Sequence, residues 1–243
     1  MKRIVTLIIA SVFTMAAFAQ DAPALKNAGN AALRSKNYQE AATQFESYFK
    51  VLEGKDKATQ YNYATCAYKI KKYNKAILLY TKSIDDRYKV SSSYLKKAYC
   101  YKKLKKANEM AATLEEGMKV KPGNRKIEKM YYGFYMKSGI ALQKAGKLEK
   151  AAADFEKVLI VTNKKFRTDA LYSLGALYSN KGASILEAAR SMANKDKTGY
   201  ATEKSKAKGF YSKAVEYLQE AANVDPSRED VKKTLEDAKK ALI

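Results

Sequence analysis

Hydrophobic and polar positions along the chain recur in a pattern typical of paired amphipathic helices. Small or apolar residues stand in pairs twelve positions apart, and larger apolar residues lie one helical turn from them. The pairs return with a period of about 34 residues, which is typical of stacked helical hairpins. We therefore predict an all-α fold of about five hairpins. The paired positions are Gly29 and Ala41, Ala64 and Ala76, Ala98 and Met110, Gly139 and Ala151, and, with a wider spacing, Gly175 and Ala214.

Residues typical of turns separate the predicted helices, as at Lys36-Asn37, Lys71-Lys72 and Gly146. Extra residues near 125–131 separate the third repeat from the fourth, and we expect them to lengthen a helix or to shift the stacking of the hairpins. The predicted repeats cover about 22–55, 57–90, 91–124, 132–165 and 168–227, within one solenoid over 20–243.

The fifth repeat contains an insertion near 181–209. Apolar residues continue the helical spacing there at Ile185, Ala188 and Met192, and a break follows near Gly199. We predict that the insertion extends both helices of the repeat into a projecting hairpin. The alternative is a disordered lysine-rich loop.

The end of the chain predicts a capping helix over 227–243, directly after Pro226. Ser227 stands where an N-cap is expected, and acidic residues follow it in the first turn. Solenoids need such a helix to cover the open end of their hydrophobic core. Its apolar stripe consists of Val231, Leu235, Ala238 and Leu242.

The N-terminal residues have the features of an export signal. Lys2 and Arg3 precede an apolar stretch at 4–18, which is short for a membrane span, and a small-x-small cleavage pattern ends at Ala19. We predict a signal peptide over 1–19 that is cleaved after Ala19. The alternative is an uncleaved anchor. A cleaved signal implies a periplasmic or secreted protein.

The charge of the chain is strongly positive, with 47 Lys and Arg against 25 Asp and Glu and a net charge of +22. Such an excess attracts acidic proteins, anionic polymers or lipid headgroups. Because the chain is predicted to be exported, nucleic acid is not an expected partner. The alternative interpretation is a solvated lysine-rich surface without a specific anionic partner.

Candidate chemistry is sparse. The chain contains no His, which excludes histidine-based acid–base catalysis and His-ligated metal sites. Cys66 and Cys100 occupy the same point of neighbouring repeats, where helix packing separates backbones too widely for a disulfide. We expect free thiols, with a disulfide as the alternative in an oxidising compartment. No catalytic constellation, cofactor motif or metal-spaced cluster is found, so we predict a non-enzymatic protein.

The repeats resemble the tetratricopeptide repeat family, especially in the segments GKLEKAAADFEKVL and YSKAVEYLQEAANVDP. The family has Gly or Ala at the eighth position, Ala at the twentieth, an aromatic residue or Leu at the twenty-fourth and Pro near the thirty-second. This chain lacks the family's Trp at the fourth position and has Met110 where Ala is usual. The resemblance implies a right-handed superhelical solenoid whose first helices line a concave groove.

The resemblance also implies which residues line that groove. Tyrosines stand among lysines at these positions, a combination that suits an extended acidic peptide. The alternative is a solvated polar groove, with tyrosines such as Tyr73 and Tyr80 in the core. The predicted groove residues are Lys26, Asn30, Arg34, Tyr61, Asn62, Thr65, Tyr68, Lys69, Leu95, Lys96, Tyr99, Lys102, Lys103, Met136, Ile140, Gln143, Lys144 and Tyr172.

Some members of that family hold the C-terminal carboxylate of a peptide with a clamp of five residues. Four of the clamp positions correspond to Lys26, Asn30, Asn62 and Lys96 in this sequence, while Ser92 stands where Lys is usual. Lys and Asn donors suit a carboxylate, so a related clamp is a hypothesis for this chain. The alternative is that these are polar residues of a solvated groove.

Together these patterns predict an exported scaffold that binds a protein or peptide in its concave face, with an acidic peptide as one candidate. The alternative function is a basic adaptor that binds an anionic polymer or a membrane surface electrostatically, with peripheral contact to an anionic envelope surface. The sequence does not determine the oligomeric state. The adaptor would use the lysines Lys96, Lys97, Lys102, Lys103, Lys105 and Lys106.

Overall fold

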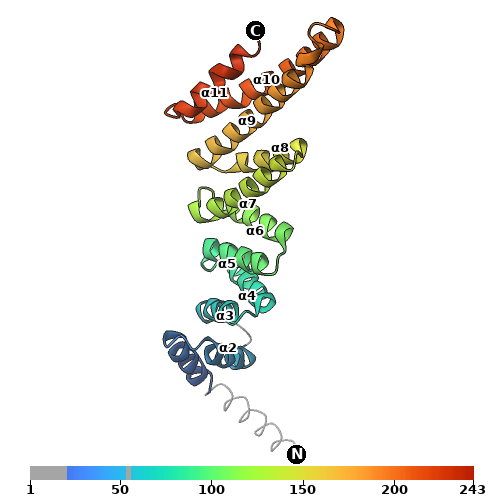
Figure 1. Cartoon of the computed structure of the whole chain (residues 1–243). Coiled ribbons are helices and arrows are strands. Elements are labelled where there is room, and N and C mark those ends of the chain that lie inside the picture. Colours follow the sequence, from blue (N-terminus) through green and yellow to red (C-terminus); the bar gives the residue numbers. More distant parts are fainter. Residues whose placement is uncertain (1–20, 53–55) are drawn as a thin grey trace, which may run out of the picture. The chain divides into compact units, whose positions relative to one another are not determined.

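The computed structural model describes residues 21–52 and 56–243, and these form two compact units. The described residues up to Lys121 belong to unit 1, and those from Pro122 onwards belong to unit 2. All regular secondary structure within the described ranges is helical (Figure 1), which confirms the predicted all-α fold. The predicted signal peptide lies outside the described residues. No helix in the described part of the chain is long and apolar enough to cross a membrane.

Unit 1 consists of consecutive antiparallel helices joined by short turns. Helix α3 packs against α4, α4 against α5, and α5 against α6, so that each hairpin contacts the next along the chain. This is the nearest-neighbour packing expected of stacked repeats. Its helices are 21–34, α2 (Tyr38–Leu52), α3 (Lys57–Lys69), α4 (Tyr73–Asp85), α5 (Val90–Lys103) and α6 (Ala107–Val120).

Glycines at the anchor positions make room for an aromatic ring of the second helix. A Cβ atom added to Gly29 would lie 2.5 Å from Cε1 of Phe45, and one added to Gly139 would lie 2.5 Å from Cε1 of Phe155. Both rings are fully buried. The small residue of the sequence pattern therefore marks the point where the two helices of a hairpin pack most closely.

The core of unit 1 is divided into clusters that follow the repeats. Cys66 packs in the cluster around Phe45, and Cys100 packs in the cluster around Tyr80. Both cysteines are free and buried, which confirms the expectation of free thiols. Burial raises the pKa of Cys66 to about 11 and that of Cys100 to about 12, so both thiols stay protonated at neutral pH.

Unit 2 contains longer helices than unit 1. Helix α7 has 20 residues, against 13 in α3 and 14 in α5, so the extra residues near 125–131 lengthen a helix. Its helices are α7 (Arg125–Lys144), α8 (Leu148–Lys157), the 3-10 turn η1 (Val158–Ile160), α9 (Lys164–Ala189), the 3-10 turn η2 (Arg190–Met192), α10 (Lys197–Val224) and α11 (Glu229–Lys240).

The lengthened start of α7 carries a buried carboxylate. Glu128 is only 1% exposed, and it accepts hydrogen bonds from the backbone N–H of Thr162 at 3.1 Å and of Asn163 at 3.0 Å. The Thr162 hydroxyl donates a third bond at 2.8 Å. These bonds hold the residues just before α9 against α7, so the extra turn helps to position the long hairpin that follows.

Helices α9 and α10 form the long hairpin of the last repeat, and they lie side by side in Figure 1. They have 26 and 28 residues, which confirms the predicted extended hairpin and excludes the alternative of a disordered loop. Asp196 caps α10 by accepting a hydrogen bond from the backbone N–H of Gly199 at 2.9 Å. Ala189 and Ala207 are buried along the added length.

Helix α11 is the predicted capping helix. It packs on α10 and buries Val231, Leu235 and Ala238, which confirms the prediction. The predicted N-cap is wrong, however. The capping position belongs to Arg228, and the hydroxyl of Ser227 donates instead to Oδ1 of Asp225 at 2.6 Å.

Candidate peptide-binding face

The predicted groove residues of unit 1 lie on the first helices of the hairpins, namely 21–34, α3 and α5. We call this surface the first-helix face. It is continuous from helix to helix: Nδ2 of Asn62 lies 3.5 Å from Oδ1 of Asn30, and Nζ of Lys96 lies 5.6 Å from the ring centroid of Tyr68. The structure therefore brings together residues that stand about one repeat apart in the sequence.

A cluster of aromatic rings and one ammonium group lies at Tyr61. Its ring centroid is 5.7 Å from that of Tyr80 and 6.0 Å from that of Tyr88, both in edge-on geometry. Nζ of Lys89 lies 4.8 Å from the Tyr61 centroid and 5.5 Å from the Tyr88 centroid. Such a cation over aromatic faces is held in place by the ring quadrupoles.

Tyr88 and Lys89 are site residues that the sequence analysis missed. They lie in the turn between α4 and α5, whereas the prediction considered only first-helix positions. Lys89 has a left-handed backbone, with φ at 45°, and this conformation starts α5 while directing the side chain over the rings. The sequence feature that predicts such residues is an aromatic residue followed by Lys directly before the first helix of a repeat.

The tyrosines of this face are fixed and neutral. Tyr80 is fully buried, as the alternative interpretation expected, and its hydroxyl lies 3.3 Å from Oγ1 of Thr65. Burial raises the pKa of Tyr61 and of Tyr68, so both keep their hydroxyl protons at neutral pH. Tyr73 is partly buried and packs against Tyr68 with a centroid distance of 5.7 Å.

The exposed end of this face is formed by the last turn of α5. Tyr99 is 37% exposed, and Lys102 and Lys103 are exposed beside it. Leu95 is partly buried on the same helix. Arg34 and Lys69 are exposed at the ends of their own helices, and Nζ of Lys69 lies 5.6 Å from the centroid of Tyr38. Tyr99 and the two lysines thus remain accessible to a partner.

Comparisons with known proteins agree with this arrangement of helices. The sequence model described as tetratricopeptide repeat matches residues 91–124, the span of α5 and α6. The crystal structure of a TPR repeats protein from Bacteroides fragilis is 41% identical, with a TM-score of 0.88, and the match covers 90% of this chain and 98% of that chain. This chain belongs to the tetratricopeptide repeat family.

Two more distant solved structures are also similar to this chain. The TPR2AB domain of yeast Sti1, solved in a complex with pHSP90, is 15% identical over 92% of this chain and 98% of its own, with a TM-score of 0.38. MamA from Desulfovibrio magneticus is 16% identical over 86% of this chain and 97% of its own, with a TM-score of 0.40. No curated protein matches this TPR protein in sequence.

Lys26, at one of the carboxylate-clamp positions of this TPR protein, is already engaged by a carboxylate of the chain itself. Nζ of Lys26 forms an ion pair of 2.6 Å with Oδ2 of Asp56, and the same carboxylate caps α3 by accepting from the backbone N–H of Thr59. Burial alone would raise the pKa of Asp56, but the bonds from Lys26 and Thr59 hold it well below its usual range. A partner carboxylate would therefore have to compete with Asp56 for Lys26.

The remaining predicted groove residues lie in unit 2, on α7 and α9. Met136 is only 8% exposed, so it contributes little surface to this side of α7. Ile140 and Lys144 are exposed and Gln143 is partly buried. Tyr172 is partly buried, with the guanidinium carbon of Arg228 5.8 Å from its ring centroid. The spacing of apolar residues predicts where a residue lies on its helix. It does not predict whether a neighbouring helix covers that residue.

Proposed function

We propose that this TPR protein is an exported, non-enzymatic scaffold that binds an acidic segment of a partner protein on the first-helix face of unit 1. The observation that carries the proposal is the cluster of Tyr61, Tyr88 and Lys89, continued by Tyr68 and Lys96. Tetratricopeptide repeats generally form protein-binding surfaces, and this cluster is where such a surface combines aromatic area with positive charge.

The cluster is suited to recognition because its parts are already ordered. The tyrosine rings pack against one another, so a partner that binds them would lose little side-chain entropy. Among the described residues no carboxylate pairs with Lys89 or Lys96, so their charge remains available to a partner. An extended acidic segment could place carboxylates near the ammonium groups and lay its backbone over the rings.

Capture of a partner tests the proposal. Residues 20–243 would be immobilised and exposed to a cell-envelope extract, and bound proteins would be identified after washes of low and moderate ionic strength. We expect at least one discrete protein to survive the moderate wash. The double variant Tyr99→Ala/Lys102→Glu should lose that protein, because both residues are accessible on the first-helix face.

Lys119→Glu provides the matched control. Lys119 lies in the last turn of α6, as Lys102 does in α5, and its replacement changes the net charge by the same amount. Capture that is unchanged by the double variant would contradict the proposal. Release of anionic polymer or lipid by salt, without a discrete protein, would instead favour the basic adaptor, since exposed charges are screened within about 10 Å at 0.1 M salt.

A further inference from the structure

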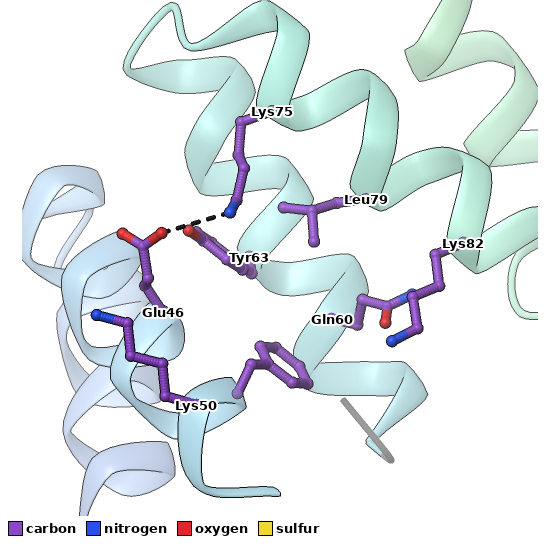
Figure 2. Close-up of a pocket in the computed structure, with 8 residues that line it drawn as sticks. Glu46, Lys50, Gln60, Tyr63, Lys75, Leu79 and Lys82 are labelled. Carbon is purple, nitrogen blue, oxygen red and sulfur yellow. Dashed lines mark hydrogen bonds and ion pairs between the residues drawn. The ribbon is translucent and has the colours of Figure 1, made fainter. Parts of the chain in front are cut away.

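Unit 1 also contains a pocket between α2, α3 and α4, which Figure 2 shows in close-up. Its volume is about 290 Å³. Helix α3 forms its floor, while the second helices of two successive repeats form its walls. The residues that line it are Glu46, Phe49, Lys50, Gln60, Tyr63, Lys75, Leu79 and Lys82.

The pocket lies on the opposite side of α3 from the first-helix face. Successive residues of an α-helix are rotated by about 100° around its axis. Gln60 and Tyr63 therefore point nearly opposite to Thr65, which lies at the middle of the first-helix face on this helix. A ligand in the pocket would not compete with one on the first-helix face.

A buried amide without a partner lines the pocket. Gln60 is 1% exposed, and its Nε2 has no hydrogen-bond partner among the described residues. Buried amide groups are nearly always hydrogen-bonded, because an unpaired donor loses its hydration without compensation. The donor points to a ligand that supplies an oxygen acceptor.

The charges around the pocket leave a positive excess. Oε1 of Glu46 pairs with Nζ of Lys75 at 3.4 Å, as the dashed line in Figure 2 marks. A hydrogen bond from the Tyr63 hydroxyl, together with Lys75 and Lys50, lowers the pKa of Glu46, so this carboxylate is charged and occupied. Within the described ranges, Lys82 has no ion-pair partner. The cavity thus presents more cations than carboxylates.

The walls between these charges are apolar. The rings of Phe49 and Tyr63 stack with centroids 6.2 Å apart, and Leu79 on α4 also lines the pocket. Burial of an apolar side chain against these groups would be favourable.

We propose that this pocket binds a protein segment that inserts one apolar side chain and carries carboxylates on either side of it. The apolar side chain would lie against Phe49 and Leu79. A flanking carboxylate would pair with Lys82. Because Nε2 of Gln60 is fully buried, its side chain would have to turn toward the opening for an oxygen of the segment to accept from it. The TPR protein would then hold partner segments on two opposite sides of α3.

Titration with short peptides tests this inference in the whole mature chain. The probe is acetyl-Glu-Asp-Phe-Asp-Glu-amide, whose only charges are the flanking carboxylates. One control peptide replaces the acids by Gln and Asn, and another replaces Phe by Ser. Binding is followed by calorimetry and by the side-chain amide signal of Gln60 in ¹⁵N-labelled protein, assigned from its absence in Gln60→Met. We expect saturable binding of the probe, weaker binding of both controls, and a shift of the Gln60 signal.

Variants of the protein locate the binding. Lys82→Glu should weaken it by about tenfold, because it reverses the charge that meets a flanking carboxylate. Gln60→Met should weaken it by about three- to tenfold while leaving the unfolding temperature unchanged or higher, since it removes an unpaired buried donor. Lys119→Glu is the matched control, because Lys119 and Lys82 both lie in the last turn of a second helix. It should leave binding unchanged.

Other outcomes would overturn the inference. These are an absence of saturable binding, equal binding of the Ser peptide, an unmoved Gln60 signal, or equal weakening by Lys82→Glu and Lys119→Glu. The double variant Tyr99→Ala/Lys102→Glu separates this inference from the proposed function. It should abolish capture on the first-helix face and leave the shift of the Gln60 signal by the probe unchanged, because that signal reports on the pocket alone.

Discussion

At the scale of single residues, two glycines of α7 show how context decides the effect of the same substitution. A Cβ atom at Gly139 would lie 2.5 Å from the ring of Phe155, whereas one at Gly133 would meet nothing within 4 Å. We expect Gly139→Ala to destabilise unit 2 by about 1–3 kcal/mol through overpacking. Gly133→Ala should stabilise it by about 0.5–1 kcal/mol, because Ala favours a helix. Urea unfolding measures both, and equal effects would contradict this account of the anchor.

Asp56 provides a pH-dependent contribution to stability at the same scale. Burial opposes its charge, but its bonds to Lys26 and to the start of α3 lower its pKa in the folded protein below the unfolded value of about 3.9. A lowered pKa stabilises the fold above the unfolded pKa, and the contribution is lost as pH falls through the folded pKa. We expect Asp56→Ala to cost about 1–2 kcal/mol at pH 7 through the lost cap.

The difference between the wild type and Asp56→Ala should shrink as pH is lowered from about 4. Thermal unfolding of both proteins between pH 7 and pH 3 measures this change. A difference that stays constant over the whole range would show that the carboxylate charge does not contribute.

At the scale of elements, Glu128 connects α7 to the start of α9. Removing its buried carboxylate leaves the N–H groups of Thr162 and Asn163 without their acceptor. We expect Glu128→Ala to destabilise unit 2 by about 2–3 kcal/mol. Hydrogen exchange at these two amides should accelerate more than exchange at the middle of α10. The control is Lys129→Ala, an exposed change one residue later on the same helix, which should have little effect on either measurement.

The hairpins also show what helical periodicity can predict at this scale. Helix positions, the extended hairpin of α9 and α10 and the cap α11 followed from apolar spacing, because each helix carries its own stripe. Ser227 was misplaced as a cap because Asp225 offers its hydroxyl a nearby acceptor. Capping depends on which nearby group forms a hydrogen bond with the side chain, and the spacing of apolar residues does not predict this.

At the scale of the whole molecule, export is the prediction that the N-terminal sequence makes. A cleaved signal peptide gives a mature protein that begins at Gln20. Fractionation of the producing cells, followed by N-terminal sequencing and intact mass measurement, checks this expectation. A protein that retains Met1 in the cytoplasm would contradict it.

The periodic pattern predicts the repeat, the all-helical fold and the small residues at the hairpin anchors, because these features depend on contacts between residues close in the chain. Which side chains of different repeats meet depends instead on how the hairpins stack. This stacking places Lys89 over Tyr61, pairs Lys26 with Asp56 and buries Met136. The pocket at Gln60 likewise needs three helices, and no periodic pattern records where their surfaces leave a space.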